Sequence, residues 1–126
     1  MAFLLLDGAI GHELKAKGID QLCSDLGYHD LFAAGSLANE IKPDLVESIH
    51  RDYINAGATV ITTNSFGCTK RSLAKASLES KQGALIQRAC DIAIKVKESF
   101  NKESSKQAAI AVAGMHHYIN NLNPVS

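Results

Sequence analysis

The sequence lacks an excess of charge of either sign. Thirteen Lys and Arg residues balance thirteen Asp and Glu residues among 126 positions. A balanced chain has no net field favouring nucleic acid or an anionic membrane, so neither is expected as a partner. Its apolar runs are far shorter than the about 20 residues of a membrane-spanning helix. The start lacks a basic segment followed by a long apolar one, so no signal peptide is predicted.

Cysteine is also scarce, with Cys23, Cys68 and Cys90 widely spaced. There is no CxxC or CxxxC pair, which excludes the standard structural zinc motifs. Three unpaired cysteines are typical of reduced thiols, so a cytoplasmic location is expected. Cys90 falls on the apolar stripe of a predicted helix, and we interpret it as a packing residue.

What the sequence does contain is typical of one folded domain. Apolar residues make up 46% of the chain and charged residues 21%, which argues against general disorder. Strands are predicted where apolar or β-branched runs end at turn-forming residues. These runs are Phe3–Leu6, Thr59–Thr63 and Ala108–Ala113. Helices are predicted over Gly11–Lys17, Pro43–Ala56 and Glu79–Phe100, whereas Ile19–Asn39 is predicted to be irregular with one helical turn near Asp30–Ala34.

The segment from Pro43 to Gly57 carries the clearest helical signals. Pro43 suits a first helical turn, where its missing N–H has no intrahelical role. Asp44 favours the positive end of the helix dipole, and Gly57 is placed to end the helix in a left-handed turn. An apolar stripe at spacings of three and four is formed by Leu45, Val46, Ile49, Tyr53 and Ile54. His50 lies among charged neighbours and is predicted to be a surface residue.

The alternation of strands and helices predicts an α/β fold with a parallel sheet, whose chemistry sits at the carboxyl ends of the strands. Asp7-Gly8 follows the first strand, where a carboxylate and free backbone N–H groups could bind an amino acid. Thr62, Thr63, Asn64 and Ser65 end the second strand. These four side chains could bind a small polar ligand or cap the next helix. We interpret Glu13 as a first-turn acid of a short helix.

These residues resemble the homocysteine S-methyltransferase family, which includes methionine synthases and betaine–homocysteine methyltransferases. The similarity rests on Leu6-Asp7-Gly8-Ala9-Ile10-Gly11-His12-Glu13-Leu14, on Leu31-Phe32-Ala33-Ala34 and on the block from Pro43 to Phe66. The resemblance implies a (β/α)8 TIM-type barrel, of which this chain would supply the amino-terminal portion, about three β/α units. It also implies methyl transfer from a donor to the thiol of homocysteine, giving methionine.

In the family, a zinc ion held by cysteines converts homocysteine into a thiolate. Those cysteines belong to later strands, so the resemblance implies that the zinc ligands are absent from this chain. It also implies that Asp7, Gly8 and Thr63 hold the amino-acid end of homocysteine. The sequence departs from the family pattern at His12, where threonine is usual, and at Phe32, where tryptophan is frequent.

A barrel of this type needs about 250 residues. We therefore interpret residues 1–126 as a partial homocysteine-binding domain with a frayed tail over 115–126, inactive alone. Its expected partners are homocysteine, a methyl donor, and either further copies of itself or a carboxyl-terminal barrel portion. Two alternatives stay open. One is a non-catalytic α/β binding or assembly module, and the other is a rebuilt metal site formed by His12, Cys68 and His116 or His117.

Overall fold

The computed structural model describes residues 10–28, 33–103 and 111–113. This part of the chain is mostly helical. Its helices are α1 (Ile10–Ala16), α2 (Ile19–Asp25), α3 (Ala34–Ile41), α4 (Pro43–Asn55), α5 (Lys70–Ala74) and α6 (Gln82–Glu103), and a 3-10 turn, η2 (Glu79–Lys81), directly precedes α6. The described residues also form two short strands, β1 (Val60–Thr62) and β2 (Ala111–Ala113).

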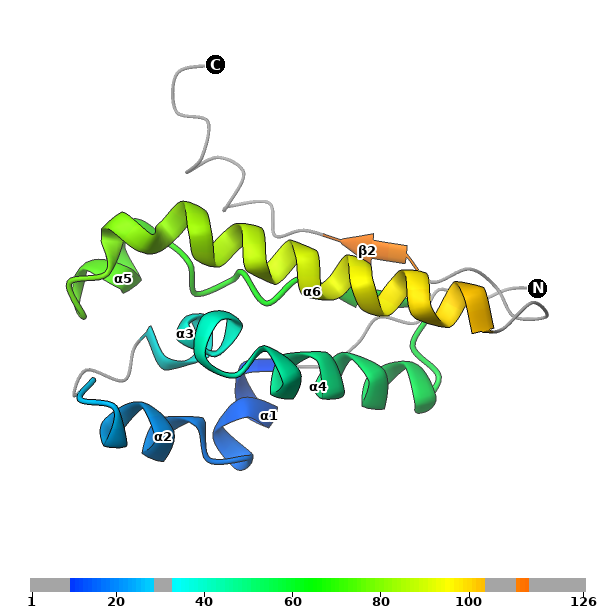
Figure 1. The fold of residues 1–126 in the computed structure, drawn as a ribbon, viewed down its shortest axis with the longest axis horizontal. Helices are drawn as coiled ribbons and strands as arrows, with labels where there is room; N and C mark the ends of the chain where they lie inside the picture. The colour runs from blue at the N-terminus through cyan, green and yellow to red at the C-terminus, as the bar shows by residue number, and fades with distance from the viewer. Residues whose placement is uncertain (1–9, 29–32, 104–110, 114–126) are drawn as a thin grey trace, which may run out of the picture.

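The two strands pair in parallel, with Ile61 opposite Val112, which confirms the parallel pairing predicted from the sequence. Parallel strands need a long crossover, and α6 occupies it. Figure 1 shows α4 and α6 side by side and running in one direction, with β2 pointing the opposite way. This is the arrangement of successive strand–helix units. The strand expected at Phe3–Leu6 and the tail over 115–126 lie outside the described residues.

The prediction for α4 and β1 is confirmed within a residue or two. Proline begins α4, and Gly57 follows its end with a φ of 118°, the left-handed conformation that glycine adopts without a Cβ penalty. Val46, Ile49 and Ile54 are buried on the predicted stripe. Strand β1 is shorter than the β-branched run that predicts it, because only its middle residues pair with β2.

The prediction of an irregular segment over Ile19–Asn39 is wrong, because this segment contains α2 and most of α3. Gly18 and Gly27 flank α2 with φ values of 87° and 94°, so these glycines separate helices. The buried face of α3 is made of Ala34, Ser36, Leu37, Ala38 and Asn39. The apolar residues of α3 do lie at helical spacing, so the segment was missed because it is short and contains the turn-forming residue types glycine, serine and asparagine.

The apolar interior consists of two clusters. The larger one joins α1, α2, α3 and α4 to α6 and includes Leu14, Leu37 and Leu85. The smaller one covers one face of the sheet and contains Ile54, Ile61, Ala93 and Val96, with Phe100 and Val112 packed against it. Ile61 and Val112 are paired residues, so they point to the same face of the sheet, toward α4 and α6.

His50 is completely buried, which corrects the expectation of a surface residue. Position 50 is four residues after Val46 and four before Ile54, so it lies on the same helical stripe as these buried side chains. Burial lowers the pKa of His50 to about 4, because the charged imidazolium is disfavoured away from water. The imidazole is therefore neutral at pH 7.

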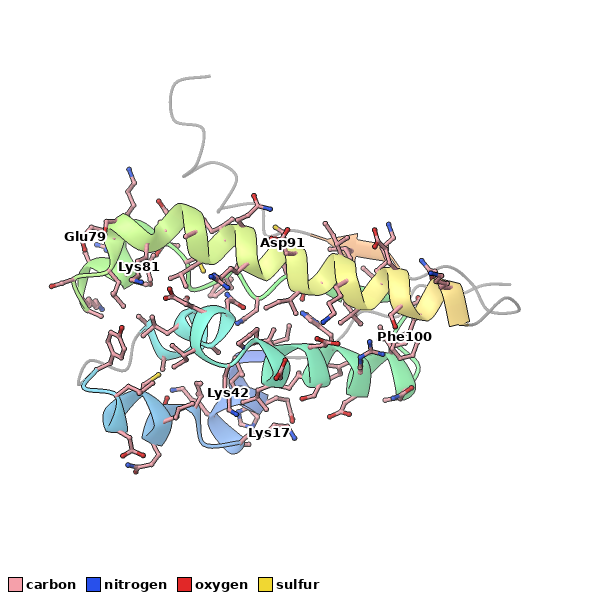
Figure 2. The ribbon with its side chains drawn as sticks, viewed as in Figure 1. Lys17, Lys42, Glu79, Lys81, Asp91 and Phe100 are labelled. Atoms are coloured by element: carbon pink, nitrogen blue, oxygen red, sulfur yellow. The ribbon has the colours of Figure 1, made fainter. Side chains whose placement is uncertain are left out.

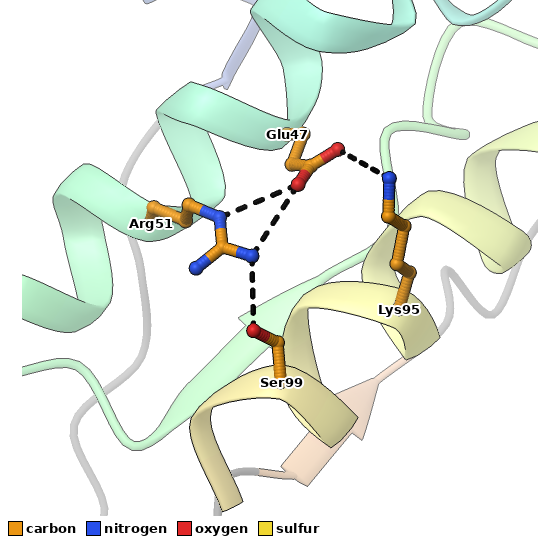
Figure 3. Close-up of polar contacts among 4 residues, drawn as sticks. All are labelled: Glu47, Arg51, Lys95 and Ser99. Atoms are coloured by element: carbon orange, nitrogen blue, oxygen red, sulfur yellow. Dashed lines mark hydrogen bonds and ion pairs between the residues drawn. The ribbon is translucent and has the colours of Figure 1, made fainter. Parts of the chain in front are cut away.

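Charged side chains on the surface join α4 to α6 (Figure 3). The Glu47 carboxylate accepts hydrogen bonds from Arg51, one turn along α4, and from Nζ of Lys95 on α6 at 3.1 Å. Arg51 also donates to the hydroxyl of Ser99 at 3.1 Å and lies over the ring of Phe100, 5.3 Å from its centre. Exposed pairs contribute little individually. The shared carboxylate therefore bridges the two helices at the surface, while their apolar contacts hold them together.

At the opposite end of α6 from Phe100 (Figure 2), the ammonium of Lys81 donates to both carboxylate oxygens of Glu40 at 3.1 Å. Glu40 lies on α3, so this pair attaches the start of α6 to α3. Across residues 10–28, 33–103 and 111–113, no helix combines the length and apolar character needed to cross a bilayer.

Candidate functional site

A polar turn follows the carboxyl end of β1. The backbone N–H of Ser65 donates to the carbonyl of Thr63 at 2.8 Å, and the N–H of Cys68 donates to the carbonyl of Ser65 at 3.0 Å. The hydroxyls of Thr63 and Ser65 lie 2.6 Å apart and share a hydrogen bond. Both residues are buried, with 5% and 1% of their surface exposed. The turn therefore places two buried, mutually hydrogen-bonded hydroxyls at the strand end.

Asn64 connects this turn to α3. Its side-chain amide donates to the carbonyl of Gly35 at 2.8 Å and to Oδ1 of Asn39 at 3.1 Å. The amide of Asn39 in turn donates to the backbone carbonyl of Asn64 at 2.9 Å and, more weakly, to that of Leu85 at 3.5 Å. Leu85 lies on α6. The two amides therefore link the turn, α3 and α6.

The polar residues at positions 62–65 do not cap the following helix, so that alternative is wrong. The N-cap of α5 is Thr69, whose hydroxyl accepts a hydrogen bond from the N–H of Ser72 at 3.1 Å. Because Thr69 fills the capping position, the strand-end residues have other roles. Thr63 and Ser65 bond to each other, and Asn64 bonds to α3.

Cys68 closes the turn and is buried. Burial raises the pKa of its thiol, the Ser36 hydroxyl has a smaller opposing effect, and Cys90 raises the pKa further. The backbone carbonyl of Cys68 accepts a hydrogen bond from the side chain of Gln82 at 2.9 Å. A buried thiol with a raised pKa stays protonated at neutral pH, whereas metal binding and nucleophilic attack need the thiolate.

The proposed metal site is only partly within the described residues. His12 is exposed on α1 and Cys68 is buried, whereas His116 and His117 lie outside the described ranges. Among the residues that the structure describes, no group of three or more His, Cys, Asp or Glu side chains could hold a metal ion. The described part therefore supplies no ligand set for zinc, and the site with His116 stays a prediction.

The structure describes only one of the three predicted substrate-binding residues. Thr63 lies in the strand-end turn, while Asp7 and Gly8 lie outside the described residues. Glu13 is partly buried on α1. Sequence reasoning missed Asn39 as a site residue, because the segment around it was not recognised as a helix. Had α3 been predicted as a helix, a polar asparagine on its buried face would have indicated that Asn39 has a hydrogen-bonding role.

Comparison with known proteins places this chain in a family. The sequence profile of the family described as homocysteine S-methyltransferase matches residues 4–122, so the chain belongs to this family. It is 34% identical to the homocysteine S-methyltransferase of Escherichia coli over 112 residues, covering 88% of this chain and 34% of that protein. It is 32% identical to the methionine synthase of Mycobacterium tuberculosis over 108 residues, covering 86% of this chain and 9% of that protein.

The three-dimensional likeness agrees with the sequence. The crystal structure of the homocysteine methyltransferase MmuM from Escherichia coli, in its metallated form, superposes with a TM-score of 0.71 at 28% identity. The match covers 98% of this chain and 42% of that one. This chain therefore spans less than half the length of the relatives named here.

Proposed function

We propose that this chain forms the amino-terminal units of a β/α barrel that binds homocysteine for methylation to methionine. The observation that carries the proposal is the buried hydroxyl pair of Thr63 and Ser65 at the carboxyl end of β1. In parallel barrels, ligand-binding residues come from the carboxyl ends of several strands. Membership of the homocysteine S-methyltransferase family supports homocysteine as the ligand of such a site.

In this proposal Asp7, Gly8 and Thr63 hold the amino-acid end of the substrate. The carboxylate of Asp7 would pair with the substrate ammonium, and backbone N–H groups near Gly8 would donate hydrogen bonds to the substrate carboxylate. The hydroxyl of Thr63 adds a neutral hydrogen bond. All three residues would be at neighbouring strand ends of one sheet, because Asp7 and Gly8 follow the first predicted strand.

The methyl transfer itself needs the homocysteine thiolate. When bound in a complete enzyme of this kind, zinc supplies that thiolate by removing the thiol proton near neutral pH. The described residues of this chain provide no ligand set for the metal. The role proposed for this chain is therefore to bind and orient homocysteine, while the metal ligands come from a carboxyl-terminal barrel portion.

A completed barrel tests the proposal. The chain is joined to the carboxyl-terminal part of the Escherichia coli homocysteine S-methyltransferase, and methionine formation is measured against homocysteine concentration. In the active fusion, Asp7→Asn should weaken homocysteine use at least about tenfold, because the proposed anionic partner of the substrate ammonium is lost. Thr63→Ala should cost on the order of 1 kcal/mol, because a neutral hydrogen bond is lost.

Ser80→Ala is a matched control, because Ser80 is exposed in the η2 turn. It should leave homocysteine kinetics unchanged. Zinc content should be equal in all variants, because none of these residues is a proposed ligand. Parent-level kinetics for Asp7→Asn would contradict the assignment. Restored methionine formation would reject the alternative of a non-catalytic module.

A further inference from the structure

The amide pair of Asn39 and Asn64 has a role beyond packing. We infer that Asn39 is a positioning residue, which fixes the turn bearing Thr63 and thereby the substrate-binding hydroxyl. Its consequence for homocysteine rests on the proposed function. The position of the turn itself is a property of this chain alone and can be tested separately.

Asn39 is well placed for this role. It is fully buried on α3, 25 positions before Asn64 in sequence, and its amide faces two backbone carbonyls from different elements. Its Oδ1 accepts the amide of Asn64. The amide of Asn39 therefore donates to the turn and to α6, and its oxygen accepts a hydrogen bond from the turn. Moving the turn would leave buried amide groups without partners, which is strongly unfavourable.

The pair acts on Thr63 through the backbone. Asn64 stands between Thr63 and Ser65, the two residues whose hydroxyls share the 2.6 Å hydrogen bond. Asn39 holds the carbonyl of Asn64, and Gly35 holds its side chain. Fixing both ends of Asn64 fixes the peptide units on each side of it. The orientation of the hydroxyl pair therefore depends on a residue that is remote in sequence.

Amide hydrogen exchange of the full chain, followed by NMR, measures this positioning directly. The reporters are the amides of Ser65 and Cys68, which form the hydrogen bonds of the turn, compared with the amide of Ala93 within α6. Asn39→Leu keeps the branched shape and the number of side-chain heavy atoms but removes every polar contact. It should raise exchange at Ser65 and Cys68 at least about tenfold relative to Ala93, as local opening of the turn does.

Val96→Ala is the matched control. Val96 is fully buried in the smaller apolar cluster, so its truncation destabilises the fold without touching the amide pair. Exchange that depends on global unfolding should rise by a common factor at Ala93 and at the turn. If Asn39→Leu raised exchange equally at Ser65, Cys68 and Ala93, the amide pair would contribute only to overall stability and the inference would be overturned. If Asn39→Leu does not fold, Asn39→Ser, which keeps a shorter polar side chain, carries the same comparison.

Homocysteine itself supplies the second measurement. The parent chain is titrated with homocysteine while the Thr63 amide is followed by NMR. Asn39→Leu should weaken binding about tenfold, whereas Val96→Ala should leave it unchanged below the unfolding temperature. A parent chain that does not bind homocysteine would show that the substrate site needs the completed barrel, and the binding comparison would then be made in the active fusion. The exchange comparison decides on the positioning role of Asn39 in either case. Equal binding by parent and Asn39→Leu would overturn that role.

Discussion

Gly67 lies so close to Ser36 that a Cβ atom added to the glycine would be 2.9 Å from the serine Oγ. Ser36 is on α3 and is buried, so the backbone of the strand-end turn rests directly on that helix. On the other side, Gln82 donates to the next carbonyl, that of Cys68. The turn after β1 is therefore held between α3 and the start of α6.

This contact predicts a coupled pair of substitutions. Gly67→Ala should lower the free energy of unfolding by about 1–3 kcal/mol, because the new methyl group overpacks against Ser36. Removing the hydroxyl in Ser36→Ala should recover part of that loss, giving a coupling energy of at least about 0.5 kcal/mol. Urea denaturation of the four members of the double-mutant cycle measures it. Simple additivity would show that the two residues do not meet in solution.

Buried His50 predicts that stability falls on acidification. The unfolded chain protonates His50 near its ordinary pKa of 6.5, whereas the folded chain does so only near 4. Between these values the unfolded state binds more protons, so the free energy of unfolding decreases as pH falls. The contribution of this one group reaches about 1.4 kcal/mol per pH unit. Urea denaturation between pH 7 and 4.5 gives the slope.

The substitution His50→Leu should flatten the dependence of the free energy of unfolding on pH, because it removes the titrating group while keeping a large buried side chain. His12→Gln is the matched control, since His12 is exposed on α1. It should leave the dependence on pH unchanged. An unaltered slope in His50→Leu would mean that other groups produce the acid sensitivity.

The three cysteines should differ in reactivity. Cys23 and Cys68 are buried, whereas Cys90 is only half-buried on α6, less than its place on the predicted apolar stripe suggested. Desolvation raises the pKa of all three thiols, so access of the reagent decides their order. Iodoacetamide should label Cys90 first in the folded chain, and Cys23 and Cys68 only as the structure opens. Peptide mass spectrometry resolves the three sites.

Cys90→Ala supplies the control for this experiment and should abolish the fast labelling phase. Urea should bring Cys23 and Cys68 to the rate of a free thiol. Labelling of Cys68 as fast as that of Cys90 in the folded chain would contradict the packing of the turn against α3 and α6.

Much of the fold could be predicted from local sequence. Proline at the start of α4, glycine after its end, and a β-branched run at β1 each restrict the backbone by themselves. The same local motifs carry the resemblance to the homocysteine S-methyltransferase family. They also placed Thr63 just past the end of a strand, because a strand end is recognisable wherever a β-branched run meets polar residues.

Only the tertiary structure decided the rest. Helix α3 buries Ser36 and Asn39 beside Leu37, and its glycine, serine and asparagine favour turns in isolation, so packing decided that this segment is helical. His50 is buried because its place on the stripe of α4 outweighs the cost of desolvating an imidazole that can stay neutral. The hydrogen bonds of Asn39 depend on α3, the strand-end turn and α6 meeting in space. Sequence patterns report local backbone preference and periodic burial, whereas pairing between remote polar groups is set by how whole elements pack.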